Sequence, residues 1–416
     1  MTADDPAYFF HLPPELIAQA PAPRRADSRL LCLERNGGLI GEHVFREIAD
    51  LLRPGDLLVL NDSRVLPARL WTRRVASGGR VELLLVRPQA DGSWLAMARP
   101  TRRLRPGQAL QVQAKTDAVE PGPRVKITDV LGDGFVVVAV PGNHPQNTLE
   151  SIAESYGEMP LPPYIRRDPA AQDGAETTRL DHQRYQTVYA RQSGSVAAPT
   201  AGLHFESELL DRLRQRGIGT AWITLHVGPG TFRPPTAEQI AGRRLHRETF
   251  QYPVATDSAI RRTRRTGGRI FAVGTTSLRV LATVQSLALD AGPTTVRKWP
   301  AAADSSPGRF VGNARYVRSK REGADFGYTT GDAADKTEAG WEVVGETRLF
   351  IRPPDEVTAV DGLLTNFHLP GSSLLMLVAA FAGETTWRRA YAHAVDAGFR
   401  FYSYGDAMLI LPADRP

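Results

Sequence analysis

Thr200 and His204 are two side chains that could carry chemistry, and both lie in a run of small residues at 194–205. Glycine and proline interrupt this run, and leucines at helical spacing after it predict a helix over 206–216. Small residues let a ligand approach the backbone, and the first N–H groups of a helix are free to bind it. The run therefore predicts a ligand-binding loop that opens a helix; a tightly packed crossover with a structural histidine is the alternative.

Polar residues also follow the predicted strand 56–60. Asn61, Asp62 and Arg64 come directly after it, at the end of a strand where open α/β sheets bind ligands. Asn and Asp also favour turns for purely local reasons. The position alone therefore favours a binding role and a turn about equally.

The predicted strand 221–226 ends in His226, and a short loop with Gly228, Gly230 and Thr231 follows it. The backbone of such a loop can wrap around an anionic or polar ligand. The loop is not a dinucleotide-binding fingerprint, because the third glycine and the strand–helix context are missing.

A cluster of hydroxyl groups at 274–277 joins the predicted strand 269–273 to a helix over 278–287. Thr275 and Thr276 there lie beside free backbone N–H groups, an arrangement that suits a carboxylate or a phosphate. Simple capping of the helix by these hydroxyls is the alternative.

Asn366 and His368 follow a later apolar stretch, and Asp406 closes the last α/β unit. Together with the residues above, they make a set of His, Asp, Asn, Thr and Arg side chains that suits proton transfer and the positioning of a polar substrate. No histidines have metal-site spacing on a helix, and the single cysteine, Cys32, excludes a cysteine zinc site. We therefore expect no metal. Phosphate-loop and serine-nucleophile motifs are absent as well.

The 416-residue chain has a formal net charge of +6 and a pI near 9.5, which is compatible with a nucleic-acid partner. A basic helix predicted near 257–266 carries four arginines that could contact RNA phosphates, although a solvated helix face is the default interpretation. These are Arg261, Arg262, Arg264 and Arg265.

The acidic N-terminus lacks the pattern of a signal peptide, and the longest apolar run, 374–382, is far shorter than the roughly 20 residues of a membrane span. We expect a cytoplasmic monomer without a membrane partner.

Short strands separated by turn signals between 67 and 145 predict an all-β module of barrel size. Because α/β segments lie on both sides of it, we expect the module to be an insertion into one larger α/β domain. The predicted limits are 1–66 and 159–416 for the main domain and 67–158 for the insert. Residues 290–345, rich in Gly, Asp, Ala, Ser and Lys without a sustained period, predict a mobile surface excursion.

Taken together, these segments resemble the S-adenosylmethionine:tRNA ribosyltransferase-isomerase family of the queuosine pathway. The matching stretches occur in family order and cover nearly all of 9–288 and 346–411. They are Leu12–Gln19, Asn61–Leu70, Arg184–Ala190, 194–205, Leu225–Phe232, Ala272–Arg279, Asp361–Pro370 and Tyr404–Asp406.

The resemblance implies a fold and a reaction. The family's fold is a larger α/β domain containing a mixed β-barrel, with a small all-β barrel inserted. The family transfers and isomerises the ribosyl unit of S-adenosylmethionine onto the 7-aminomethyl-7-deazaguanine at the wobble position of tRNA. Epoxyqueuosine-tRNA, adenine and methionine are the products. S-adenosylmethionine is the ribosyl donor, and no other cofactor is implied.

The residue types can then be given roles as hypotheses. His204 and His226 are candidate bases or acids, with His368 a third candidate. Asp62 and Asp406 are candidates to hold ribose hydroxyls or the substrate amine. For the methionine carboxylate or an RNA phosphate, the candidates are Thr275, Thr276 and Arg279. The resemblance does not fix which residue does what.

The sequence also departs from the family pattern. A His-x-Met-His-x-Glu pattern is replaced at 243–248, where Arg243 and Leu245 stand and only His246 and Glu248 match. Ala282 stands where a glutamate is expected, and 352–354 reads Arg-Pro-Pro instead of Tyr-Pro-Gly. Two other functions are therefore possible: an RNA-binding homologue without catalysis, and an S-adenosylmethionine-dependent RNA methyltransferase. The missing Gly-rich loop after a first strand counts against the methyltransferase.

Overall fold

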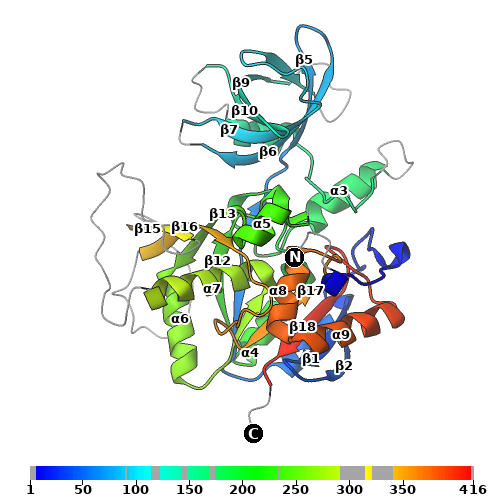
Figure 1. Cartoon of the computed structure of the whole chain (residues 1–416), viewed down its shortest axis with the longest axis vertical. Coiled ribbons are helices and arrows are strands. Elements are labelled where there is room, and N and C mark those ends of the chain that lie inside the picture. The colour runs from blue at the N-terminus through cyan, green and yellow to red at the C-terminus, as the bar shows by residue number, and fades with distance from the viewer. Residues whose placement is uncertain are drawn as a thin grey trace.

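The computed structural model describes residues 6–89, 91–113, 122–142, 148–167, 174–232, 234–290, 314–320 and 341–413. Figure 1 shows a large α/β body with a smaller β-barrel above it. The barrel's strands all come from one continuous stretch of chain, whereas the strands of the large body come from both sides of that stretch.

A ten-stranded mixed sheet forms the large body, in the order β15-β16-β13-β12-β3-β14-β17-β18-β1-β2. Its centre, β12-β3-β14-β17, is a block of parallel strands, and the neighbours β13 and β18 run antiparallel to that block. The bounds are β1 Arg29–Glu34, β2 Leu39–Val44, β3 Leu57–Asn61, β12 Gly219–Leu225, β13 Arg244–Pro253, β14 Ile270–Val273, β15 Ala314–Lys320, β16 Trp341–Leu349, β17 Gly362–Asn366 and β18 Ala407–Leu411.

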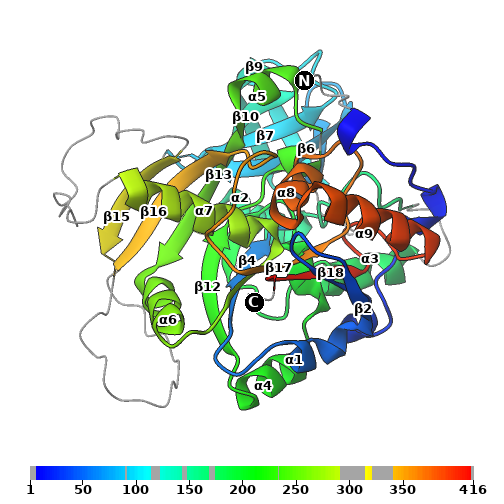
Figure 2. The same cartoon turned by 60° about the horizontal axis from the view of Figure 1, so that its bottom comes forward.

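Helices cover both faces of this sheet, as Figure 2 shows. Alternate residues of β3 point to opposite faces: Leu57 and Val59 pack with the α7–α9 side, and Leu58 and Leu60 pack with the α1 and α4 side. Burial on both faces explains why the central strands are continuous apolar runs. The helices are α1 Ile48–Leu51, α3 Gly174–Arg184, α4 Ser207–Gln215, α5 Ala237–Gly242, α6 Val254–Arg265, α7 Gly274–Asp290, α8 Ser373–Ala382 and α9 Glu384–Asp396.

The small body is a closed antiparallel barrel in the order β10-β7-β6-β5-β8-β9. Its strands alternate buried and exposed residues, as a barrel with one internal core requires. The predicted strands of the module are all present. The bounds are β5 Arg69–Arg74, β6 Arg80–Pro88, β7 Trp94–Arg99, β8 Ala109–Val112, β9 Arg124–Gly132 and β10 Phe135–Ala139, with helix α2 at Leu149–Tyr156 after them.

The structure differs from one expectation about the main domain. A mixed β-barrel was expected there, but the described strands form an open row that ends in two antiparallel hairpins, β15–β16 and β1–β2. Closure needs the end strands to pair with each other, and β15 and β2 stand at opposite ends of the row.

Short elements complete the large body. Strands β4 Ser63–Val65 and β11 Gln192–Ser195 pair as a separate two-stranded sheet. The 3₁₀ turns are η1 Pro6–Tyr8, η2 Pro14–Leu16, η3 Arg25–Asp27, η4 Phe45–Glu47, η5 Thr200–His204 and η6 Pro229–Phe232.

Most of the excursion predicted at 290–345 lies outside the described residues; within it, the structure describes β15 and the start of β16. In the described part of the chain, no helix is long and apolar enough to cross a membrane.

The two connections between the bodies lie side by side. Arg69 and Glu158 exchange backbone hydrogen bonds of 3.2 and 2.8 Å. At this contact Gly157 lies so close to the other connection that an added Cβ would stand 1.7 Å from the carbonyl oxygen of Pro67. Only glycine fits between the two backbones.

We therefore predict that Gly157→Ala destabilises the protein, because the new methyl group forces the connections apart at a cost of about 1–3 kcal/mol or more. Urea unfolding measures the loss. The control is Gly38→Ala, where an added Cβ meets nothing within 4 Å and the change is expected to be about 1 kcal/mol or less. Equal effects of the two substitutions would contradict this account of the connections.

Candidate functional site

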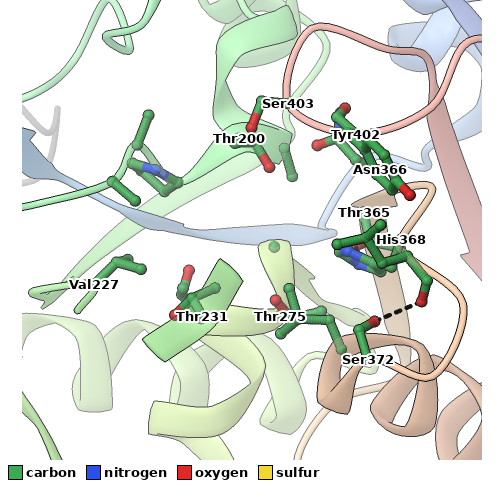
Figure 3. Close-up of a pocket in the computed structure, with 18 of the residues that line it drawn as sticks. Thr200, Val227, Thr231, Thr275, Thr365, Asn366, His368, Ser372, Tyr402 and Ser403 are labelled. Carbon is green, nitrogen blue, oxygen red and sulfur yellow. Dashed lines mark hydrogen bonds between the residues drawn. The ribbon is translucent and has the colours of Figure 1, made fainter. Parts of the chain in front are cut away.

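A cavity lies at the carboxyl edge of the parallel strand block. Ligand sites of α/β sheets occur at this edge. Figure 3 shows its lining side chains. The polar lining residues are Tyr164, Thr200, Thr231, Thr275, Thr276, Thr365, Asn366, His368, Ser372, Tyr402 and Ser403.

The sequence makes room for this cavity with small residues. Ala197, Ala198 and Ala201 form part of its wall. Gly274 has φ +88°, a left-handed conformation that lets β14 turn directly into α7. Thr275 and Thr276 consequently lie in the first turn of a 17-residue helix and line the cavity. The first N–H groups of α7 have no partners within the helix and can meet an anion there.

Among the residues that line the cavity, His368 has the only imidazole. Its Nε2 is 2.8 Å from Thr365 Oγ1, and its backbone N–H donates to the Tyr391 hydroxyl at 3.0 Å. Burial lowers the pKa of His368 from its ordinary 6.5 to about 3. The ring is therefore neutral at physiological pH.

Thr231 enters the cavity from a loop that a buried charge cluster holds in place. The carboxylate of Glu248 accepts hydrogen bonds from the Thr231 hydroxyl and the Gly228 N–H, each at 3.2 Å. It also pairs with Arg279 and with His246. Burial alone would raise the pKa of Glu248, but the charges of Arg279 and His246 and the hydrogen bonds outweigh it and hold the pKa well below its usual range. The cluster therefore supplies an ionised anchor beneath the loop.

The chain is similar to proteins of one known family. The family described as "Queuosine biosynthesis protein" matches residues 6–410. A protein of Azoarcus sp. is 43% identical over 415 residues, covering 100% of this chain and 99% of its own. A Geobacter sulfurreducens protein is 44% identical over 405 residues, covering 96% and 98%. Both are named S-adenosylmethionine:tRNA ribosyltransferase-isomerase.

The chain belongs to this family. A crystal structure of the S-adenosylmethionine tRNA ribosyltransferase from Thermotoga maritima is 31% identical and covers 97% of this chain and 100% of its own, with a TM-score of 0.46.

In this ribosyltransferase-isomerase family member, six of the predicted site residues line the cavity together. They come from four segments that are far apart in the sequence: η5, η6, α7 and the end of β17. Figure 3 shows Thr231 and Thr275 across from His368 and Asn366. The six are Thr200, Thr231, Thr275, Thr276, Asn366 and His368.

The structure places other predicted residues in the framework around the cavity. Asn61 is fully buried, and its amide exchanges two 3.0 Å hydrogen bonds with the backbone of Leu225, so it ties β3 to β12. Asp62 accepts from the Thr224 hydroxyl at 2.6 Å. The carboxylate of Asp406 accepts the backbone N–H groups of Arg29 and Arg400 at 2.9 and 2.8 Å. These side chains already have structural partners.

Four more predicted residues lie outside the cavity lining. Arg64 forms a surface ion pair with Glu154. His226 is half-buried and packs against Gly194, and its partial burial lowers its pKa. His204 lies directly behind Asn366 and contacts it through Nε2 at 3.1 Å. Gly230 packs over the ring of His246, whose Nδ1 would lie 2.5 Å from a Cβ at that glycine.

The four arginines predicted to contact RNA lie on α6, which leads into the start of β14. The start of β14 is the edge of the sheet opposite to the cavity. Arg261 is paired with Asp257, and Arg264 donates to the backbone carbonyl of Ala359. Arg262 and Arg265 are exposed. The structure does not bring this cluster together with the cavity.

Sequence reasoning missed several cavity residues. Tyr164 comes from the Pro-rich segment after the barrel, and its hydroxyl lies 2.7 Å from Ser403 Oγ. Tyr402 has φ +73°, a conformation that non-glycine residues adopt mostly where function or packing demands it. Thr365 and Ser372 complete the missed set. Sequence analysis singled out Asp406, whereas Tyr402 and Ser403, shortly before it in the chain, are the residues at the cavity.

The departures from the family pattern lie away from the cavity lining. Arg243 ends α5 in a left-handed conformation and pairs with Asp355. Leu245 is buried in the main core, and Ala282 packs against that core. Arg352 is buried beside the ring of Phe350. In the described residues, no group of three or more His, Cys, Asp or Glu side chains gathers as a metal site would require.

Proposed function

We propose that the protein transfers and isomerises the ribosyl unit of S-adenosylmethionine onto the 7-aminomethyl-7-deazaguanine wobble base of tRNA. Adenine and methionine leave, and epoxyqueuosine-tRNA remains. Family membership over 6–410 supports the reaction class. The observation that carries the site is the cavity itself, because two buried polar atoms on its wall, Thr276 Oγ1 and Asn366 Oδ1, have no partner among the described residues. Such atoms need a hydrogen-bond partner, and a polar ligand in the cavity can supply it.

The methionine carboxylate fits the amino end of α7. Thr275 and Thr276 offer hydroxyl groups there, and the first N–H groups of the helix add a partial positive charge. Arg279, the other predicted carboxylate ligand, is bound to Glu248 instead. In this proposal Arg279 therefore supports the Thr231 loop and does not contact the donor.

His368 is the base in this proposal. The sulfonium of S-adenosylmethionine acidifies the neighbouring C5′ protons, so that a neutral imidazole can remove one. Ring opening of the ribose then releases adenine, the substrate amine attacks, and epoxide closure expels methionine. The proton passes to the His368 ring, which its contact with Thr365 holds in place. The activation thus comes from the donor's own positive charge.

A tRNA partner fits the distribution of charge over the chain. Residues 69–139, which form the barrel, contain 12 Lys and Arg and 6 Asp and Glu, a net +6. Of the chain's 51 basic and 45 acidic residues, the remainder is 39 of each. Residues 69–139 thus carry a net charge equal to that of the whole chain, and the full insert 67–158, with Glu150, Glu154 and Glu158 added, carries 12 − 9 = +3. We propose that the inserted domain, with limits near 67 and 158, contacts the RNA backbone, because neutralising phosphates supplies much of RNA affinity.

Incubation with deazaguanine-bearing tRNA and ribose-labelled S-adenosylmethionine tests the function. The expected result is label in the RNA with an equal amount of free adenine, despite the departures at 243, 245 and 282. S-adenosylhomocysteine as the product would identify a methyltransferase. Bound tRNA without any product would identify a binding protein that has lost catalysis.

In the same assay, His368→Gln is expected to lower kcat by about 10²–10⁴-fold with a smaller change in KM. Because the pKa of His368 is about 3, the wild-type ring stays neutral as pH falls, and kcat/KM should stay level from about pH 8 to about pH 5. An ordinary histidine would lose activity below about pH 6.5. Loss of turnover in His226→Gln, with His368→Gln active, would refute the assignment.

For the RNA surface, the pair Arg102→Glu and Arg103→Glu on the barrel is compared with Arg262→Glu and Arg265→Glu on α6. All four side chains are exposed, so neither pair threatens the fold. The barrel pair is expected to weaken tRNA binding about tenfold or more and to reduce its salt dependence, since each lost phosphate contact lowers the slope by about one. A larger effect of the α6 pair would favour the helix instead.

A further inference from the structure

The side-chain amide of Asn366 has a fixed orientation. Its nitrogen donates to His204 Nε2 at 3.1 Å, to the Tyr402 carbonyl at 3.1 Å and to the Asp406 carbonyl at 3.5 Å. Two of these partners are backbone carbonyl oxygens, which only accept hydrogen bonds. The amide nitrogen must therefore face them, and the oxygen must face the other way.

This orientation also assigns the proton on His204. Because Nε2 accepts from Asn366, the ring proton of the neutral imidazole is on Nδ1, which lies 2.6 Å from Ser28 Oγ. The Ser28 hydroxyl in turn donates to the Arg25 carbonyl at 3.3 Å. The His204 Nδ1–H and the Ser28 hydroxyl each meet one acceptor, and backbone carbonyl oxygens lie at both ends of these hydrogen-bonded residues. The ring of His204 is further held by stacking on Phe45, with centroids 4.9 Å apart.

These hydrogen bonds leave one polar atom of Asn366, its side-chain oxygen Oδ1, without a partner among the described residues. Asn366 is 1% exposed and lines the cavity, yet its Oδ1 accepts no hydrogen bond from the described residues. A buried oxygen left in this way costs about 1–3 kcal/mol unless a ligand supplies a donor. Figure 3 shows Asn366 beside Tyr402 on the cavity wall.

We propose that Asn366 Oδ1 accepts a hydrogen bond from the adenosyl group of S-adenosylmethionine, and that His204 and Ser28 are positioning residues that hold it ready. The inference rests on the proposed function for the identity of the ligand. The adenosyl group offers three suitable donors: the 6-amino group of adenine and the 2′- and 3′-hydroxyls of ribose.

This role differs from that of a base. His204 lies one residue behind the cavity lining, and its two ring nitrogens are already engaged by Asn366 and Ser28. Burial, together with the charges of Arg400 and Arg25, lowers its pKa to about 3. His204 therefore holds the Asn366 amide in its orientation. The hydrogen-bonded residues Arg25, Ser28, His204 and Asn366 act as one unit.

Equilibrium binding to the full-length protein tests the proposal, with a tRNA that carries ordinary guanine at the wobble position so that no turnover occurs. The probes are S-adenosylmethionine and three analogues: the 6-oxo, 2′-deoxy and 3′-deoxy forms. One analogue is expected to bind wild type about 5–150-fold more weakly than S-adenosylmethionine, the range set by one unsatisfied buried acceptor. In Asn366→Ala that particular difference should disappear while the differences for the other two analogues persist.

The variants behind Asn366 separate positioning from simple damage. His204→Phe keeps the stacking on Phe45 but removes the acceptor, so the amide can rotate and the same difference should shrink. His204→Gln, whose side-chain oxygen can accept the Asn366 N–H, should restore part of it. Ser28→Thr keeps the hydroxyl and should behave as wild type, whereas Ser28→Ala should not. Thermal unfolding confirms that each variant is folded.

Ser372→Ala is the matched control, because it removes a hydroxyl from the same cavity without touching this hydrogen-bonded unit; it should leave the chosen difference unchanged. If Asn366→Ala weakens all four ligands equally, or if no analogue binds wild type more weakly than S-adenosylmethionine, the proposal is wrong. Wild type that shows the expected binding pattern but releases no adenine with the deazaguanine tRNA would overturn the proposed function and leave the Asn366 contact standing.

Discussion

Burial of the central strand β3 on both faces is the constraint on which the rest of the structure depends. Its five residues, Leu57–Asn61, are all buried, with helices packed on each side of the sheet. Burial on both faces is typical of parallel strands joined by helical crossovers, and both neighbours of β3, β12 and β14, run parallel to it. The loops after the parallel strands then gather at one edge. The cavity lies at this edge because the loops that line it follow the parallel strands.

The buried polar residues at this edge fall into two groups. In the first, the side chain has its hydrogen bonds within the protein: Asn61 joins two strands, and Asp406 closes a turn. In the second, an atom still needs a donor or an acceptor, as with Thr276 and Asn366. The first group keeps the edge rigid, and the second defines what a ligand must offer. Residue type alone cannot separate them, since both groups contain an asparagine.

The sequence predicted the parts of the fold that depend on local pattern. The barrel strands were predictable because alternation and turn residues repeat at short intervals, as in 80–86 and 135–140. The shape of the main sheet was not, because closure depends on where the end strands β15 and β2 lie relative to each other. The prediction of a mixed β-barrel in the main domain was therefore wrong, because the described strands form an open sheet.

In the site, too, some residues could be predicted from local sequence patterns and others depend on the tertiary arrangement. Motif positions drew attention to hydroxyls at helix and strand ends, and the structure places Thr275 and Thr276 in the cavity lining. The sequence could not rank the histidines, because His226 and His368 both follow strands and only the loop paths put one of them at the cavity. Tyr164 reaches the cavity from the segment that returns from the barrel. It is far in sequence from most of the other lining residues, so no local sequence pattern predicts that it meets them.

A cavity without carboxylates suits a cationic donor under the proposed function. The described lining offers hydroxyls, an amide, a neutral imidazole and tyrosine rings, but no Asp or Glu. A carboxylate beside the sulfonium would stabilise the bound donor and offset the positive charge that acidifies its C5′ protons. Neutral groups can form hydrogen bonds to the donor without neutralising the sulfonium charge. Binding then does not lower the free energy of the ground state at the reacting carbon. The charged groups of this region, Glu248 and Arg279, are instead paired with each other behind the Thr231 loop. Their pairing keeps both charges out of the cavity lining and holds the Thr231 loop in place, an arrangement that the proposed chemistry favours.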